Sequence, residues 1–430
     1  MRRFGQRCYH THIAGPSSKS TAGFTEKDPF ETPRCVRPLP FGGIDPASVR
    51  GQNPAMLDVL PALGLLGASV ILSVRTSMSW VRGRRVVRNG IPGRSVLVVV
   101  AVPRGGEPGR AMARSLAATA YAGPMALRIG CQTGEVSGAR LAEEALRVAP
   151  GLDVSAISVT PSSREVSMPR FAIEAALDHD SDVVALVDVA TRPTARDLAR
   201  LLSCPMDSGP RWVAAVPVKG TGGTFIGGVW SGVATDMAPM TAAACGAAGL
   251  PALLSAGTRS AWDAIGQDSL ALHRPTLAHS AALCSDRQAV LVPVPSALHP
   301  GCERLWTRDS LRVLWRACPL GMLWVLAALL ALPVAICTMM SSGTHVRLTA
   351  SVVLAAWVSR MLTALTWGRS TCGVGSAVIA TLLAPFRDIV SSSAFIASAF
   401  LSKMYVGGDE FRVRRGGVLV PVAKVPRFDE

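Results

Sequence analysis

Asp188 is the residue in this sequence that is best placed to do chemistry, because it directly follows a short apolar run. Residues 183–187 predict a buried strand, and after Pro193 the leucines fall on one face of a predicted helix. A buried strand that ends in a carboxylate, just before a helix that starts at a proline, is typical of nucleotide sites in open α/β sheets. In a second interpretation Asp188 only caps the following helix, and the spacing leaves both interpretations open.

Strand and helix patterns alternate regularly around Asp188. Strands are predicted at 95–102, 125–131, 154–159, 183–187 and 212–218, and helices at 111–120, 139–148 and 170–177. This alternation predicts an α/β fold with a doubly wound, mostly parallel sheet, which places Asp188 at the carboxyl edge. The glycine-rich span 220–228 has no GxGxxG sequence between a strand and a helix, so we do not interpret it as a phosphate-binding loop.

The composition indicates a membrane protein. Of the 430 residues 49% are hydrophobic and only 17% are charged, which is too apolar for an ordinary soluble chain. The net charge of +15 suits an anionic bilayer surface or phosphate-bearing substrates. Aromatic residues make up 5% and do not alternate with a basic patch, so no nucleic-acid partner is expected. The ten cysteines form no CxxC pair, which argues against a zinc site and fits a reducing, cytosol-facing domain.

Three apolar stretches are long enough to cross a bilayer. Residues 56–74 form the first, although a buried core helix would also fit them. A cluster of arginines between 75 and 88 follows, which should stay cytoplasmic by the positive-inside rule. Residues 320–340 and 349–367 form the others, and Arg360 within the last of them needs a polar partner or a snorkelling route to the membrane surface. The weaker runs 373–385 and 389–404 fit two short spans, a re-entrant hairpin or interfacial helices.

The expected organisation therefore has five parts. They are a disordered basic arm (1–53), a transmembrane anchor (54–75), a central α/β domain (94–316), transmembrane or interfacial helices (318–404) and a basic, β-like cytoplasmic tail (405–430). We expect a multi-pass protein of the cell (inner) membrane whose central domain faces the cytoplasm.

Several short segments between residues 94 and 420 resemble, in order and spacing, the ceramide-glucosyltransferase-like branch of the inverting GT-A (family 2 type) glycosyltransferases. They are Glu107-Pro108-Gly109, Arg114-Ser115-Leu116, Asp188 with Arg192-Pro193, Trp230-Ser231, Ala256-Gly257 and Pro385-Phe386-Arg387-Asp388. The resemblance implies a GT-A-like cytosolic domain between an N-terminal anchor and C-terminal membrane segments.

On the donor side, the resemblance implies that Asp188 contacts the diphosphate or its divalent metal, Mg²⁺ or Mn²⁺. The family's Asp-x-Asp pair reads Asp188-Val189-Ala190 here, so one of the two carboxylates that a hard cation prefers is missing. The family's nucleoside-contacting acid falls at Thr133, with Glu135 nearby as a substitute, and Glu107 belongs to the loop after the first strand.

On the acceptor side, the family's catalytic Asp pair falls at His273-Arg274. A histidine can act as a base near neutral pH, and Asp236 is the other candidate, although His273 beside an arginine also fits an ordinary surface pair. The arginines near the membrane resemble a signature that binds the diphosphate in composition but not in spacing, and they equally fit the basic flank of a membrane helix. They include Arg308, Arg312 and Arg316.

The resemblance implies an inverting hexosyltransferase that moves a hexose from a nucleotide sugar to a ceramide- or hopanoid-like lipid acceptor at the cytoplasmic face. The alternative is a catalytically reduced relative that keeps the fold in order to bind a lipid or a partner protein, because acids are lost at three separate places. A transporter is disfavoured, since the membrane part is small and holds a single mid-span charge.

Overall fold

The structure is a computed structural model of the chain. It describes residues 59–102, 110–119, 121–132, 136–159, 180–188, 191–218, 237–251, 253–264, 288–298, 302–341, 346–371, 373–406, 409–417 and 419–422. The arm expected at 1–53, the helix expected at 170–177 and the glycine-rich span 220–228 lie outside these residues.

An eight-stranded sheet forms the centre of the described chain, in the order β3-β2-β1-β4-β7-β6-β8-β5. The strands are β1 (Val96–Val102), β2 (Met125–Gln132), β3 (Asp153–Val159), β4 (Val183–Asp188), β5 (Thr191–Arg192), β6 (Trp212–Val218), β7 (Leu254–Thr258) and β8 (Ala289–Leu298). All pairings are parallel except those of β7 with β4 and β6 and that of the two-residue β5 with β8. The predicted α/β fold with a mostly parallel sheet is confirmed.

Both faces of the sheet are buried, which explains why β1 is apolar at every position. Val98 and Val100 pack with residues of three helices on one face. These helices are α3 (Arg110–Ala117), α4 (Ser137–Val148) and α6 (Ala195–Leu202). Leu97 and Val99 point to the other face and pack with Trp212 and Trp367.

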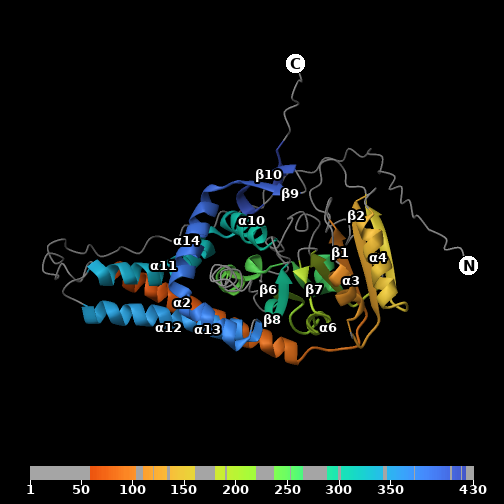
Figure 1. The fold of residues 1–430 in the computed structure, drawn as a ribbon, viewed down its shortest axis with the longest axis horizontal. Coiled ribbons are helices and arrows are strands. Elements are labelled where there is room, and N and C mark those ends of the chain that lie inside the picture. The colour runs from red at the N-terminus through yellow and green to blue at the C-terminus, as the bar shows by residue number, and fades with distance from the viewer. Residues whose placement is uncertain are drawn as a thin grey trace, which may run out of the picture. The chain divides into compact units, whose positions relative to one another are not determined.

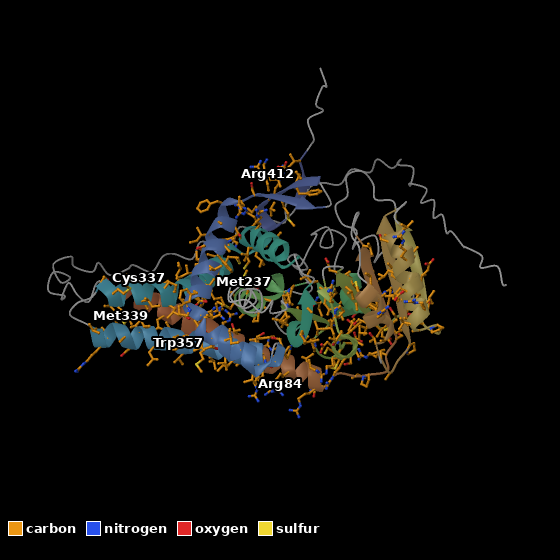
Figure 2. The ribbon with its side chains drawn as sticks, in the orientation of Figure 1. Arg84, Met237, Cys337, Met339, Trp357 and Arg412 are labelled. Carbon is orange, nitrogen blue, oxygen red and sulfur yellow. The ribbon has the colours of Figure 1, made fainter. Side chains whose placement is uncertain are left out.

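Among the described residues, three helices are long and apolar enough to cross a membrane. They are α2 (Leu60–Arg88), α11 (Pro319–Ser341) and α12 (Val346–Thr371), which pack against one another (Figure 1). Figure 2 labels Met339 and Trp357 on the apolar lengths of α11 and α12, and Arg84 at the basic end of α2. The chain is therefore built to associate with a membrane.

Helix α2 continues past the predicted anchor and lies on the sheet. At Gly83 an added Cβ would come within 2.5 Å of the Leu291 carbonyl oxygen, so only a glycine allows this close approach to β8. From α12, Trp367 joins the same sheet core and donates a hydrogen bond to the Thr76 carbonyl at 3.1 Å. The apolar helices and the sheet thus share one packed core.

A polar seam joins α2 to α12. The hydroxyl of Ser359 lies 2.9 Å from those of Ser69 and Ser73, and Thr363 donates to Ser73 at 3.2 Å. All four side chains are buried. Small hydroxyl residues let membrane helices approach closely and hydrogen-bond without water, so this seam fixes how the two helices face each other.

The embedded Arg360 has a polar partner, which is one of the two arrangements that the sequence left open. Its Nε and Nη2 atoms each donate to Asp388 at 2.8 Å, and both side chains are at most 1% exposed. Asp388 belongs to α14 (Ala384–Phe400), which follows the nine-residue α13 (Val374–Leu382), and Arg387 lies 3.5 Å from the same carboxylate. The first weaker apolar run is therefore a helix, α13, that is too short to span a bilayer. The second lies in α14, which is held against α12 by the ion pair between Asp388 and Arg360.

A small antiparallel sheet ends the described chain. Its strands are β9 (Lys403–Val406), β10 (Asp409–Val413) and β11 (Leu419–Pro421), and Val313 of α10 (Cys302–Ala317) packs against Met404 and Phe411. The apolar run predicted at 389–404 thus belongs to two elements, since helix α14 ends at Phe400 and strand β9 begins at Lys403. Residues 423–430 of the predicted tail lie outside the described residues.

Candidate functional site

Asp188 is the last residue of β4, at the carboxyl edge of the parallel strands. Its neighbour across the pair is Ala101 in β1. The direction in which strands are added to the sheet reverses here. Strands β2 and β3 follow β1 on one side of it, whereas β4 lies on the other side. Such a topological switch point is where open α/β sheets bind their ligands. The structure therefore places the predicted acid at the edge where a nucleotide is expected.

The backbone of Asp188 is held on both sides. Its N–H donates to the Leu253 carbonyl at 2.8 Å, and its own carbonyl accepts from the buried Thr191 hydroxyl at 2.7 Å. The five strand residues before Asp188 are buried, whereas Asp188 itself is partly exposed. A fixed backbone with a partly exposed carboxylate is a preorganised arrangement for ligand contact.

The capping interpretation of Asp188 is wrong, because Thr194 caps the following helix. The Thr194 hydroxyl accepts from the Asp197 N–H at 3.1 Å and donates to the Asp197 carboxylate at 2.6 Å. Helix α6 begins at Ala195, so the expected start at Pro193 is also wrong, and Pro193 lies just before the cap. The signal was present in the sequence, since Thr-x-x-Asp is a capping-box pattern.

The segment after Asp188 is tied to two more elements. Thr191 pairs with Leu298 at the end of β8, and the Ser115 hydroxyl of α3 donates to the Pro193 carbonyl. These contacts gather the end of β4, the end of β8 and helix α3 around one edge. The sequence did not indicate Thr191 or Ser115 as contributors to the site.

Several predicted site residues lie outside the described residues. They are Glu107, Thr133, Glu135, Asp236 and His273. Their flanking strands are described, however, and Val102 at the end of β1 pairs with Cys131 near the end of β2. Strands β1 and β2 therefore end at the same edge as Asp188.

The predicted phosphate-binding arginines lie on α10, which packs against α14 and the small C-terminal sheet. Arg312 is 6% exposed and donates from Nη1 to the Lys403 carbonyl at 2.6 Å. Arg316 donates to the Ala399 carbonyl at 3.4 Å, in the last turn of α14, where helix carbonyls favour a cation. Arg308 belongs to the same helix, and its side chain lies outside the description. The described contacts of Arg312 and Arg316 are structural.

The donors described at this edge do not form a metal clamp. A hard divalent cation prefers several carboxylate or carbonyl oxygens. Within the described ranges no group of three or more His, Cys, Asp or Glu side chains is arranged to hold a metal ion. The acid that the described part of β4 brings to its carboxyl end is Asp188. This carboxylate can contact one cation or accept hydrogen bonds from sugar hydroxyls.

Comparisons with known proteins give remote likenesses. No family model matches the sequence, and no curated protein matches it. A mannosyltransferase from Pyrobaculum calidifontis, solved with GDP-Man and Mn²⁺, has a TM-score of 0.43 at 11% identity, over 77% of this chain and 98% of its own. The glucosyl-3-phosphoglycerate synthase of M. tuberculosis has a TM-score of 0.34 at 13% identity, over 53% and 81%. TarS of S. aureus, residues 1–349, has 0.30 at 8%, over 77% and 100%. TM-scores below 0.5 do not establish a common fold.

Proposed function

We propose that this protein is a membrane-anchored glycosyltransferase that moves a hexose from a nucleotide sugar to a lipid acceptor at the cytoplasmic face. The observation that carries the proposal is the position of Asp188, held by Leu253 and Thr191 at the switch point between β1 and β4. The sequence resemblance supports the reaction class. The position of Asp188 at the carboxyl edge of the sheet supports a nucleotide site there.

A lipid acceptor follows from how the apolar helices meet the sheet. Gly83 of α2 lies against β8, and Trp367 of α12 is part of the sheet core. The sheet is therefore held directly at the membrane, because α2 runs as one helix from its apolar residues to its contact with β8. A transferase held there meets lipid hydroxyls, for which a ceramide- or hopanoid-like molecule is our proposal.

The proposed reaction is a single displacement with inversion. The acceptor oxygen forms a bond to the anomeric carbon, the bond from that carbon to the diphosphate oxygen breaks, and its electron pair leaves with the nucleoside diphosphate. His273 or Asp236 takes the acceptor proton as general base. Asp188 orients the donor, and Glu107, Thr133 and Glu135 line the nucleoside side in this proposal.

The leaving diphosphate carries charge that must be balanced. A Mg²⁺ or Mn²⁺ ion would supply that balance when bound, with Asp188 as its ligand. Since the second acid of the family's pair is missing at Ala190, we propose that dependence on the metal is weak. Arg308 is the α10 arginine that we propose for direct phosphate contact, because the guanidinium groups of Arg312 and Arg316 already donate to carbonyls.

A second candidate function is supported by the small number of charged side chains that the structure describes near the proposed site. One carboxylate at the end of β4, together with two arginines used in structural contacts, also suits a reduced relative that binds a lipid or a partner protein. This candidate keeps the fold and the membrane helices but has no transfer activity.

Transfer of radiolabelled hexose from nucleotide sugars to a lipid extract separates the two candidates. The proposed enzyme labels a lipid, Asp188→Asn abolishes the labelling, and EDTA lowers it less than Arg308→Ala does. Asp182→Asn, which changes the acid just before the other end of the same strand, serves as the matched control and should keep the activity. No transfer from any nucleotide sugar by the folded wild-type protein would favour the reduced relative.

A further inference from the structure

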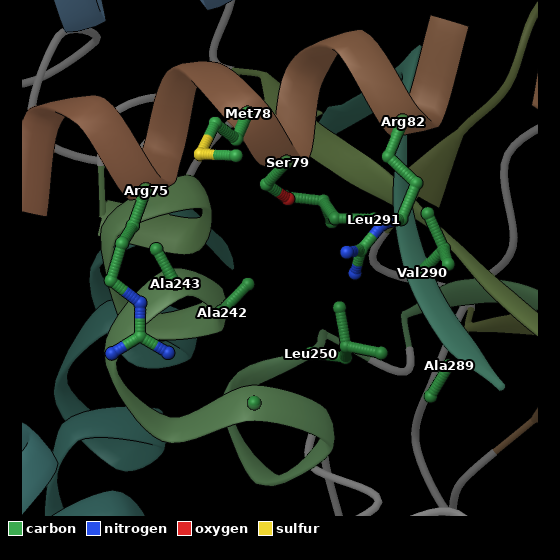
Figure 3. Close-up of a pocket in the computed structure, with 11 residues that line it drawn as sticks. Arg75, Met78, Ser79, Arg82, Ala242, Ala243, Leu250, Ala289, Val290 and Leu291 are labelled. Atoms are coloured by element: carbon green, nitrogen blue, oxygen red, sulfur yellow. The ribbon is translucent and has the colours of Figure 1, made fainter. Parts of the chain in front are cut away.

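A pocket lies beside α2, where the helix changes from apolar to basic. Arg75 is the first charged residue of α2, and residues 60–74 before it carry none. The pocket is about 140 Å³ in volume. Its walls are the Arg75–Arg82 stretch of α2, the helical segment around Ala242, and the start of β8 at Ala289 (Figure 3).

Two arginines reach this pocket from one helix. Arg75 and Arg82 are seven residues apart, which is about two turns or roughly 10 Å along the axis, so both lie on one side of α2. The Ser79 side chain lies between them and also lines the pocket. Figure 3 shows Arg82 extending into the space between α2 and Leu250, while Arg75 extends past Ala243 on the other side.

The remaining basic residues of this helix end do not share the arrangement. The Arg84 guanidinium stacks on the Trp80 ring, 5.0 Å from its centroid. Arg85 and Arg88 are exposed in the last turn and do not line the pocket. Positive charge therefore converges on the pocket from Arg75 and Arg82 and is not merely spread around the helix.

We propose that this pocket binds the phosphate of an anionic membrane lipid. Guanidinium groups pair with phosphate oxygens through two parallel hydrogen bonds, and Ser79 adds a hydroxyl donor. Met78 and Leu250 give the pocket an apolar wall that suits the glycerol and first acyl carbons. Basic pockets beside membrane helices, at the level where the apolar span ends, are known to hold lipid phosphates.

The pocket is separate from the proposed donor site. Strand β8 begins at the pocket, and β8 runs parallel to β4, because β7 is antiparallel to both β4 and β6 whereas β6 is parallel to β8. The pocket therefore lies toward the edge where the strands begin, whereas Asp188 lies where β4 ends. The lipid site stands independently of the proposed transferase function.

Native mass spectrometry of the detergent-purified full chain tests the proposal. The probes are dioctanoyl phosphatidylglycerol, dioctanoyl phosphatidylcholine and inorganic phosphate. We expect phosphatidylglycerol to bind more tightly than the other two, and Arg75→Gln and Arg82→Gln each to weaken it about tenfold, the loss of one paired guanidinium. Arg88→Gln is the matched control on the same helix and should bind as wild type does.

Two results would overturn the proposal. Equal weakening by all three substitutions would mean that a diffuse basic belt attracts the lipid. Inorganic phosphate binding as tightly as phosphatidylglycerol would mean that the site holds a free anion. Because Arg75 and Arg82 are exposed, the variants should fold, and an unfolding temperature equal to that of wild type for each variant guards against a folding artefact.

Discussion

Two acids, Asp388 in the membrane bundle and Asp188 at the sheet edge, are placed in opposite ways. Asp388 is 0% exposed and accepts two hydrogen bonds from Arg360, with Arg387 beside it. Asp188 is partly exposed, and what holds it firmly is its backbone. The first arrangement fixes helices against one another, and the second leaves a carboxylate partly exposed at the sheet edge where we propose that a nucleotide binds.

Removing the charge of Asp388 should have the largest effect on stability. Asp388→Asn leaves the Arg360 guanidinium buried without its counter-charge, which typically costs about 3–5 kcal/mol. We expect a large drop in the unfolding temperature of the detergent-solubilised protein. Arg369→Gln, at an exposed position on α12, the helix that carries Arg360, should leave that temperature unchanged. An Asp388→Asn protein as stable as wild type would show that the pair does not hold the bundle together.

Removing the cap of α6 should have a moderate effect. Thr194→Ala deletes the hydroxyl that accepts from the Asp197 N–H, at a typical cost of about 1 kcal/mol. Thr194→Ser keeps the oxygen and should be close to wild type. Thermal unfolding monitored by circular dichroism measures both variants. If alanine and serine behave alike, the hydroxyl contributes nothing and α6 is held by packing alone.

Asp182 should give the smallest effect, visible as a pH dependence. Hydrogen bonds from the Ser95 N–H and hydroxyl, both 2.9 Å long, lower the pKa of Asp182 below its usual 3.8. The stability that this ionised group contributes is present above the usual pKa and disappears as the pH falls through the lowered value. Asp182→Asn should therefore flatten the decline of stability below about pH 4, and the effect is small because the side chain is exposed. A decline as steep in the variant as in wild type would contradict this.

The sequence predicted the sheet well where apolar runs were unbroken. The strand predicted at 212–218 is β6, and the strand predicted at 183–187 is β4 with Asp188 added. Strand β8 was not predicted, because Pro293 and Pro295 interrupt it, and prolines demote a run to a non-strand. Strand β7 was missed because its sequence, LSAGT, carries almost no β-branched side chains.

Local sequence patterns could not identify which residues become the interaction partners of a charged side chain in the folded chain. Arg360 was expected to need a polar partner, but Asp388 lies 28 residues further along the chain and only the packing of α14 on α12 brings it close. Arg312 was expected to bind phosphate, and nothing in its neighbours indicated that its guanidinium meets the Lys403 carbonyl. Composition and spacing can indicate that a charge needs a partner, whereas the fold decides which partner it has.

Calorimetric titration of UDP and GDP, with and without Mn²⁺, tests most directly whether the carboxyl edge of β4 is a nucleotide site. Asp188→Asn should lose nucleotide binding at an unchanged unfolding temperature, because its side chain is partly exposed and does not cap α6. Asp182→Asn, beside the opposite end of the strand, should bind as wild type does. Unchanged nucleotide binding by Asp188→Asn, or a loss of stability comparable to that of Asp388→Asn, would contradict the assignment of Asp188 to the site.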